Sequence, residues 1–256
     1  MELVLFVSTG RCGTKFLSES IRDKRSYICH EVEHPSAKDI MRDLYIPLAI
    51  NADKIQGRKI IKEYKLPQIR ASLKKNKKVR YIDTGHQYNY GLFSPILEMI
   101  PSTKLVRLRR SRYETALSFL TTPPENDIWN TQDYNGYFRW MMSPKFKIAQ
   151  NQNHVLSFWN KLTRLQKVIW AIDEVERMWL DIIDNHNVSY IEMDFEDIKV
   201  NNFSKLEAFL DVKVKSRTNE KSKNSSSFWN REKPNISHEE FTYQDKELLS
   251  LYNSQI

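Results

Sequence analysis

The chain has 256 residues, of which 40% are hydrophobic, and it carries a formal net charge of +8 with a pI near 9.3. This hydrophobic content is enough for one sizeable core and excludes disorder as the default state. Two cysteines exclude a disulfide framework and favour a reducing compartment. The basic charge favours anionic partners, but does not choose among nucleotide, nucleic acid, sulfated sugar and acidic lipid.

The first apolar run of the chain spans residues 3–7 and is too short for a signal peptide or a membrane span. Later apolar runs do not reach the length of a membrane span either. The sequence therefore predicts a soluble, cytoplasmic protein with no membrane partner.

Short apolar runs alternate with helical periodicity along most of the chain, which predicts a parallel sheet with crossover helices. We expect one domain over 1–256, with irregular segments at 121–136 and 213–237. A long amphipathic helix, or two in succession, is expected within 156–183. Strands are expected at 3–7, 59–62, 79–82, 104–108 and 188–193, and shorter helices at 14–22, 91–99 and 112–120.

The turn "STGRCGTK" follows the first expected strand and precedes a helix. Backbone N–H groups and the positive end of a helix dipole meet at such a turn. Gly10 and Gly13 permit a tight backbone, Thr14 offers a hydroxyl, and Arg11 and Lys15 add positive charge. The turn therefore predicts an oxyanion site.

Three common phosphate sites do not fit this turn. A Walker A loop needs Gly-Lys-Ser/Thr, and here Phe16 stands where the magnesium-binding hydroxyl belongs. A cysteine phosphatase loop needs an arginine six residues after Cys12, where the chain has Ser18. A dinucleotide fingerprint needs G-x-G-x-x-G, which "GRCG" does not supply. The turn is thus equipped for a phosphate but not for magnesium-ATP.

A second strand-to-helix junction lies in "KLVRLRRSRYETALSFL", residues 104–120. Arg110 stands just before the expected helix, and Ser118 lies about two turns into it. Their side chains can approach one phosphate from two directions, since arginine offers forked donors and serine a hydroxyl.

In these two junctions the sequence resembles sulfotransferases that use 3′-phosphoadenosine 5′-phosphosulfate (PAPS). Their first motif is a strand followed by K/R-x-G-T, which "GRCGTKFL" matches. Their second is R-x-P-x-x-x-x-x-S, which "RSRYETALS" matches in spacing, with Arg112 in place of proline. Their C-terminal strand, turn and helix resemble residues 189–212. The resemblance implies a P-loop-NTPase-like, three-layer α/β fold with a central parallel sheet.

The resemblance also implies the roles of individual residues. Arg11 neutralises charge at the bridging oxygen and the 5′-phosphate, while Arg110 and Ser118 bind the 3′-phosphate. Lys15 either assists or is a solvated surface residue. The implied cofactor-binding residues of the two junctions are Gly10, Arg11, Cys12, Gly13, Thr14, Lys15, Phe16, Arg110 and Ser118.

The expected base for the attacking hydroxyl lies in "VRYIDTGHQY". Asp83 stands at the family's acidic position and His86 near the histidine of its small-molecule branch, and both stay open. In the late basic segment, Arg217, Lys221 and Lys223 are candidates for closing over the cofactor. Cys12 lies beside Arg11 at a helix N-terminus, an environment that lowers a thiol pKa. The resemblance implies a small residue in place of the family's frequent serine rather than a catalytic thiol, and alkylation is expected to inactivate by blocking PAPS.

The predicted function is transfer of a sulfuryl group from PAPS to a hydroxyl or amine of a small-molecule or carbohydrate acceptor, with no metal and no nucleic-acid partner. The acceptor pocket is expected from 30–57, 86–95 and 121–150. Two alternatives are a P-loop-like nucleotide kinase and a non-catalytic nucleic-acid-binding protein, the latter from the charge, "KKNKKVR" and the segment 213–233. The oligomeric state is not predicted. Tyr88, Tyr90, Trp129, Tyr134, Tyr137, Phe138 and Trp140 either line that pocket or pack in the core.

Overall fold

The structure is a computed structural model. It describes residues 1–30, 54–85, 87–89, 91–121, 144, 152–216 and 234–253.

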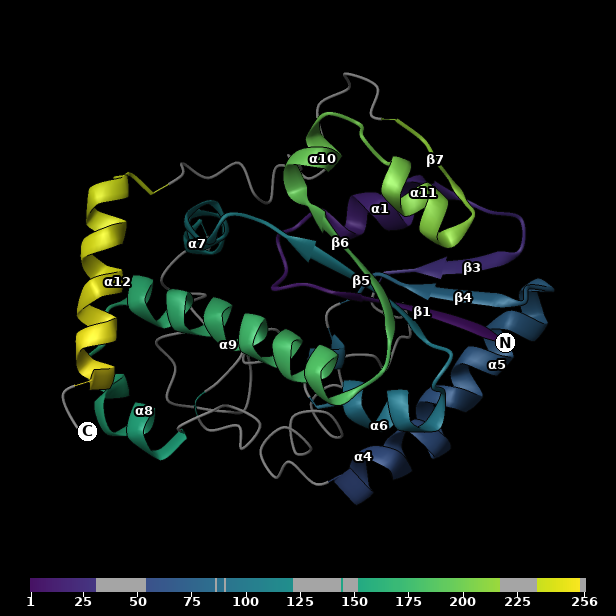
Figure 1. The fold of residues 1–256 in the computed structure, drawn as a ribbon, viewed down its shortest axis with the longest axis horizontal. Coiled ribbons are helices and arrows are strands. Elements are labelled where there is room, and N and C mark those ends of the chain that lie inside the picture. The colour runs from purple at the N-terminus through teal and green to yellow at the C-terminus, as the bar shows by residue number, and fades with distance from the viewer. Residues whose placement is uncertain are drawn as a thin grey trace.

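A parallel five-stranded sheet forms the centre of the molecule (Figure 1). Its strands are β1 (Glu2–Val7), β3 (Ser26–Cys29), β4 (Arg80–Asp83), β5 (Lys104–Arg109) and β6 (Ser189–Asp194), in the order β3-β4-β1-β5-β6. A two-stranded antiparallel ladder joins β2 (Ile21–Arg22) to β7 (Lys213–Val214).

Helices cover both faces of this sheet. They are α1 (Thr14–Ser20), α4 (Lys54–Ile60), α5 (Leu66–Asn76), α6 (Phe93–Met99), α7 (Arg112–Leu120), α8 (Gln152–Phe158), α9 (Arg164–Asn185), α10 (Phe195–Lys199), α11 (Ser204–Leu210) and α12 (His238–Asn253). A π-helix (Ile61–Lys65) joins α4 to α5, and 3₁₀ turns occur at Gln87–Asn89 and Trp159–Lys161. The predicted parallel α/β sheet with flanking helices is confirmed.

The strand order fixes where a ligand can bind. The chain leaves β1 toward the β3 edge and leaves β5 toward the β6 edge, so the two neighbouring strands have connections that diverge. In open parallel sheets, ligands bind outside the carboxyl ends of strands at such a switch point. The residues after Val7 and Arg109 therefore occupy the expected position for a site.

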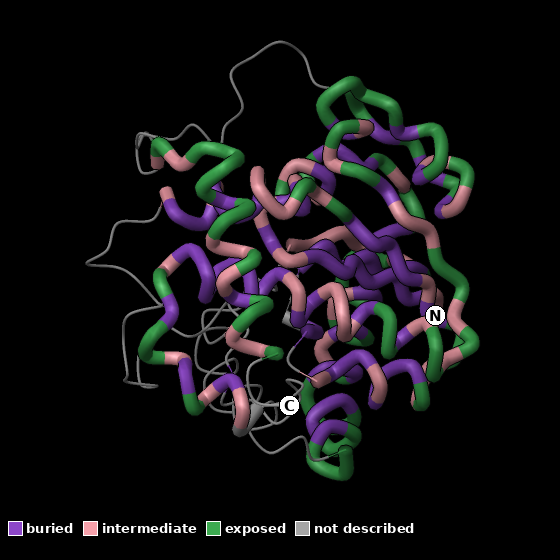
Figure 2. Tube along the Cα trace, turned by 60° about the vertical axis from the view of Figure 1, so that its left-hand side comes forward, coloured by how far each residue is buried: buried purple, intermediate pink, exposed green. Residues whose placement is uncertain are grey.

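The side chains of β1 alternate between the two faces of the sheet, and each face packs against its own core layer. Leu3, Leu5 and Val7 face the larger layer, which contains α5, α6, α7, α9 and α12. Val4 and Phe6 face the smaller layer with α1, α10 and α11. The buried strands run through the centre of Figure 2, with exposed segments on the outer helices. This two-sided burial explains why the strand reads as a continuous apolar run.

Four of the five predicted strands are observed within two residues of their expected bounds, and the strand predicted at 59–62 is wrong. Residues 54–76 form a helical arm whose middle turn is a π-helix. Ile60 and Ile61 bury one helical face, and a short apolar run cannot distinguish a buried strand from such a face. Pro67 has no N–H to donate to the preceding turn, in keeping with the widened turn before it.

The predicted long amphipathic segment is two helices, α8 and α9, separated by a 3₁₀ turn. Thr163 begins α9 with a capping box, in which its hydroxyl accepts from the Gln166 N–H and the Gln166 side chain accepts from the Thr163 N–H. Trp170 and Trp179 are buried in the larger core layer. The aromatic side chains of this segment are thus core residues.

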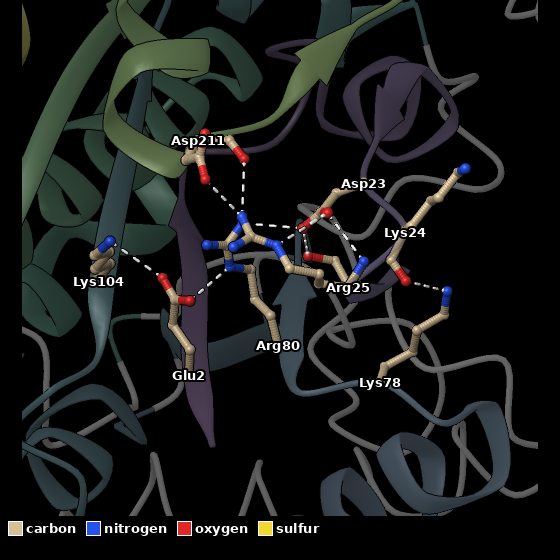
Figure 3. A network of polar contacts seen from close by, with 9 residues as sticks. Glu2, Asp23, Lys24, Arg25, Lys78, Arg80, Lys104 and Asp211 are labelled. Atoms are coloured by element: carbon tan, nitrogen blue, oxygen red, sulfur yellow. Dashed lines mark hydrogen bonds and ion pairs between the residues drawn. The ribbon is translucent and has the colours of Figure 1, made fainter.

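Acidic residues neutralise the cations at the edge where the strands begin (Figure 3). The buried Arg80 guanidinium donates to Glu2 Oε2 at 2.7 Å and to Asp23 Oδ2 at 3.0 Å, and Glu2 also pairs with Lys104 at 3.1 Å. Arg25 Nη2 lies 2.7 Å from Asp211 Oδ2. This network ties β1, β4 and β5 together at the edge opposite the switch point.

Arg112, the residue that departs from the family's proline, connects three helices. From the first turn of α7, its guanidinium donates to Asp173 Oδ2 of α9 at 2.7 Å and to both carboxylate oxygens of Asp245 on α12. Burial and a neighbouring carboxylate raise the pKa of Asp173 to about 6, although Arg112 opposes this shift. Arg112 thereby holds the C-terminal helix, which the sequence analysis did not predict, on α9.

We expect Arg112→Ala to lower the free energy of unfolding by about 1–3 kcal/mol, because it removes charge-assisted hydrogen bonds at a partly buried junction. Arg109→Ala is the control, because Arg109 is 55% exposed in its pairs with Glu192 and Asp194 and such pairs contribute about 0–1 kcal/mol. Urea denaturation measures both. Equal losses in the two variants would contradict the role of Arg112.

Candidate functional site

The turn after β1 is held in shape by its own side chains. The Gly10 N–H donates to Ser8 Oγ at 3.1 Å, and the Cys12 thiol donates to the Gly10 carbonyl at 3.0 Å. Gly10, Arg11 and Gly13 all have positive φ, at 85°, 58° and 82°. Left-handed residues in such a turn can direct backbone N–H groups into one concavity, which suits an anion.

Gly13 is required on two grounds. Its φ of 82° is strained for any residue with a side chain, and an added Cβ would lie 3.1 Å from Phe195 Cε2 and 3.3 Å from Ile198 Cδ1. The α10 helix therefore packs directly against the turn. This contact joins the carboxyl end of β6 to the site.

Several backbone donors of the turn lack protein acceptors. The N–H groups of Gly13, Thr14 and Lys15 make no hydrogen bond within the described parts of the chain. The first turn of a helix leaves its N–H groups without intrahelical partners, so these donors need an outside acceptor. Lys15 is exposed, the Thr14 side chain is buried, and the Phe16 ring lies 6.2 Å from the Phe203 ring.

Arg110, at the second predicted junction, reaches this turn. Its Nη1 donates to the Arg11 carbonyl oxygen at 2.9 Å, and its Nη2 donates to Glu114 Oε2 at 3.1 Å. The guanidinium carbon lies 4.6 Å from the centre of the Phe195 ring. Its buried Nε has no partner among the described residues. The structure thus brings together three segments that the sequence analysis singled out separately.

The positive charges of Arg11 and Arg110 are close enough to repel one another. The pKa of Arg11 is lowered, first by burial and then by the charge of Arg110. The Arg11 guanidinium lies 5.6 Å from the centre of the Phe119 ring. Two adjacent, partly desolvated cations favour an anion between or beside them, because the anion offsets both their mutual repulsion and the cost of their burial.

The placement of Ser118 is less informative. It lies on α7 and is half-buried, but its hydroxyl makes no hydrogen bond within the described residues, and its carbonyl accepts from Thr121. No contact between Ser118 and Arg110 is observed. Its assigned role stays a prediction.

Asp83 lies at the end of β4, as expected, but its carboxylate is sealed in the core. Oδ1 accepts from the Gly85 N–H at 2.9 Å, while Oδ2 accepts from Tyr88 Oη at 2.8 Å and Lys65 Nζ at 3.2 Å. Asp83, Tyr88 and Lys65 are at most 1% exposed. Tyr88 therefore belongs to a buried polar network, and it also lines a cavity of about 560 Å³ together with residues of α4, α6 and α9.

Lys65, Glu114 and Phe195 belong to the site region but were not predicted. Lys65 occupies a position in the apolar series that continues with Ile69 and Leu73, and a lysine there indicates a buried partner. Glu114 lies four residues after Arg110, a spacing typical of helical ion pairs. No sequence pattern singles out Phe195.

Several residues that were predicted as the base, as pocket lining or as cofactor contacts lie outside the part of the chain that the structure describes. They are His86, Tyr90, Trp129, Tyr134, Tyr137, Phe138, Trp140, Arg217, Lys221 and Lys223.

The lowered thiol pKa predicted for Cys12 is wrong. Its side chain is fully buried in the smaller core layer, and burial raises the pKa of its thiol, outweighing the charges of Arg107 and Arg110. The thiol serves instead as a hydrogen-bond donor that shapes the turn. Burial also raises the pKa of Cys29 well above its usual range.

The chain matches no model of a known protein family and has no significant match among curated proteins. Among the described helices, none is long and apolar enough to cross a membrane. The described His, Cys, Asp and Glu residues form no cluster of three or more that could hold a metal ion.

We expect the Cys12 thiol of the native protein to react with dithionitrobenzoate at pH 8 at least about a hundredfold more slowly than in guanidinium, because burial suppresses thiolate formation and blocks access. Absorbance of the released thiolate measures the rate, and a Cys29→Ser variant isolates Cys12. Rapid stoichiometric labelling of native Cys12 would show that the thiol is not buried.

We expect Lys65→Met to lower the free energy of unfolding by about 3–5 kcal/mol, because it leaves a buried carboxylate without its cation. Lys62→Met, on the exposed side of the same π-helix, is the control and should change stability by less than about 0.5 kcal/mol. The Lys65→Met/Asp83→Asn double variant should lose clearly less than the sum of its single changes. Additive losses in urea denaturation would contradict the pairing.

Proposed function

We propose that this protein is a sulfotransferase that transfers a sulfuryl group from PAPS to a hydroxyl or amine. The observation that carries the proposal is the 2.9 Å hydrogen bond from Arg110 Nη1 to the Arg11 carbonyl, which sets the candidate 3′-phosphate residue against the candidate 5′-phosphate turn. The resemblance of both motifs to this enzyme class supplies the ligand. In this proposal the parallel sheet belongs to the P-loop-like sulfotransferase fold.

The available donors suit the two phosphate groups of PAPS. The N–H groups of Gly13, Thr14 and Lys15 await acceptors at the turn, and the Arg110 Nε lacks a partner at the second junction. Arginine's forked donors match phosphate geometry, whereas serine at 118 adds one hydroxyl from α7. Phe195, beside both Arg110 and Gly13, provides an apolar wall between the two groups.

Sulfuryl transfer requires charge neutralisation, alignment and a base. When bound, PAPS supplies the activated sulfuryl group. Arg11 stabilises negative charge at the leaving phosphate, and the turn's N–H groups orient it without a reorganisation step. Because Arg11 is already partly desolvated, its charge acts more strongly than at an exposed site.

The acceptor proton goes to Asp83 or His86 in this proposal. The Asp83 carboxylate already receives three hydrogen bonds, so action as a base requires it to give up Tyr88 or Lys65. As it stands, Asp83 fixes the segment that leads to His86. The pH dependence of kcat/KM in an Asp83→Asn variant distinguishes the two candidates. An unchanged pH dependence would leave His86 as the base, whereas loss of the fall in activity at acidic pH would favour Asp83.

The two alternative functions have weaker support. A kinase loop needs a hydroxyl for magnesium where this chain has Phe16, half-buried beside Phe203. A nucleic-acid-binding protein does not need two convergent arginines at a switch point. Thermal denaturation with three ligands separates these classes, since a ligand of the native state raises Tm.

We expect 3′-phosphoadenosine 5′-phosphate at about 100 times its Kd to raise Tm by roughly 5 °C or more. Magnesium-ATP and an oligonucleotide should not do so. Stabilisation by magnesium-ATP alone would favour the kinase, and by the oligonucleotide alone the nucleic-acid-binding protein.

We expect Arg110→Ala to raise the KM for PAPS about 10- to 100-fold with a much smaller change in the acceptor KM, because a charged hydrogen bond contributes about 1.5–3 kcal/mol. Arg109→Ala removes the same charge one residue earlier, at an exposed position that contacts β6 side chains. It should leave both KM values within about twofold, as expected for a surface pair. Equal effects of Arg110→Ala on donor and acceptor would count against the 3′-phosphate role.

A further inference from the structure

The excess positive charge of the protein lies in one helical arm, residues 54–78, which we call the basic arm. It contains ten Lys and Arg residues and a single acidic residue, Glu63, and so has a net charge of +9. The whole chain has a net charge of +8, so all other residues together sum to −1. The arm thus carries as much net charge as the whole chain, although the segment 213–233, with seven Lys and Arg against two Glu, is basic as well.

Three cations of the basic arm contact other parts of the fold, one of them being Lys78, whose Nζ donates to the Lys24 carbonyl oxygen at 2.5 Å. Lys65 is buried against Asp83, and Arg58 Nη2 lies 2.5 Å from Glu98 Oε2. Six others have exposed side chains that make no ion pair within the described part of the chain. They are Lys59, Lys62, Arg70, Lys74, Lys75 and Lys77.

The arrangement of these six cations is costly without a partner. They lie along a helical arm about 35 Å long, given a rise of about 1.5 Å per residue. At the edge where the strands begin, by contrast, Arg25, Arg80 and Lys104 each pair with a carboxylate (Figure 3). A run of unpaired like charges repels itself, and an anionic partner removes that repulsion.

Apolar side chains are exposed among the charges. Ile55 is 77% exposed and Tyr64 is 48% exposed, and Val79, directly after the arm, is 63% exposed. Single exposed apolar residues are ordinary, but here three of the chain's large exposed hydrophobic residues accompany its densest positive charge. Lysines combined with projecting apolar and aromatic side chains are typical of surfaces that rest on a lipid interface.

We propose that the basic arm binds the surface of a bilayer that contains anionic lipids. The cations attract the headgroups, and Ile55 and Tyr64 enter the boundary between headgroups and acyl chains. The sequence analysis expected no membrane partner because no apolar run is long enough to span one. Surface binding needs no such run, so that expectation does not apply to this contact.

The position of the basic arm suits attachment rather than catalysis. The arm packs on β3 and β4 through α5, whose end lies beside the N-terminus in Figure 1, at the edge where the strands begin. The turn after β1 and Arg110 lie beyond the opposite ends of their strands. The middle of the arm reaches the other edge of the sheet, where Lys65 pairs with Asp83 at the end of β4, but the six exposed cations are not residues of the candidate site. The bilayer proposal therefore does not depend on the proposed transferase.

A linear polyanion is the competing partner. Its binding uses the lysines but gains little from Ile55, because sulfates and phosphates on a polymer offer no apolar layer. The exposed apolar residues favour the bilayer, and this difference also provides the test.

Vesicle flotation at 50 and 200 mM NaCl tests the proposal. One set of vesicles contains phosphatidylcholine alone, and the other includes 30% phosphatidylserine. The variants are Lys59→Gln/Lys62→Gln/Lys74→Gln/Lys75→Gln, Ile55→Ser/Tyr64→Ser, and a control, Lys199→Gln/Lys205→Gln/Lys213→Gln/Lys246→Gln, which removes equal charge from exposed positions elsewhere. Circular dichroism verifies that each variant folds.

We expect the wild-type protein and the control to float with phosphatidylserine vesicles at 50 mM NaCl, and less so at 200 mM. The lysine variant should bind at least about a hundredfold more weakly, since each lysine near the surface contributes about fivefold. The serine variant should lose severalfold. Equal binding by the lysine variant and the control overturns the proposal, as does failure of the wild-type protein to bind.

Heparin and duplex DNA, measured by fluorescence anisotropy, complete the comparison. Binding of either polymer with higher affinity than the vesicles, and with no effect of Ile55→Ser/Tyr64→Ser, assigns the arm to a linear polyanion and overturns the bilayer proposal.

Discussion

The hydrogen bond from Arg110 Nη1 to the Arg11 carbonyl joins two strand-to-helix junctions that lie 99 residues apart in the sequence. It exists because β1 and β5 are parallel neighbours, with Val7 beside Arg107, so both chains leave the sheet at the same edge. The bond places a second cation next to Arg11, whose pKa is lowered first by burial and then by the charge of Arg110. Everything proposed for the site depends on this juxtaposition of positive charge and unused N–H donors.

The buried pair Lys65–Asp83 connects the rest of the fold to the same edge. Lys65 comes from the basic arm and Asp83 from the end of β4, so one ion pair links the charged outer helices to the segment after β4. Tyr88 completes the network from that segment. Because both charges are buried, the pair favours one arrangement of the arm over others, although such pairs add little net stability compared with apolar packing.

The local pattern of the sequence predicted most of the sheet and the two junctions. Strands such as β1 and β5 are short apolar runs bounded by charge or glycine, and their parallel order follows from the helices between them. The error at residues 59–62 arose because Ile60 and Ile61 fill a buried helical face, which a short window cannot distinguish from a strand. The C-terminal helix was missed because its apolar contacts are sparse: Phe241 and Leu248 are its buried residues, and Arg112 holds it by charge.

For the site, the sequence predicted residue types better than it predicted their environments. Arg11 and Arg110 were identified from their positions at strand ends, and parallel pairing brought them together. The pKa of Cys12 could not be predicted, because the direction of a side chain in a tight turn depends on the core beneath it. The hydrogen bonding of the Asp83 carboxylate depends on a lysine 18 residues earlier, and only the fold brings the two side chains into contact.

A calorimetric comparison of two ligands and two proteins tests the central claim most directly. The Kd values of 3′-phosphoadenosine 5′-phosphate and adenosine 5′-monophosphate are measured for the wild-type protein and for Arg110→Ala. If Arg110 and the turn after β1 bind opposite ends of one ligand, the wild-type protein should prefer the bisphosphate by about 10- to 100-fold. The variant should lose most of that preference while still binding the monophosphate. A variant that keeps the full preference would contradict the account.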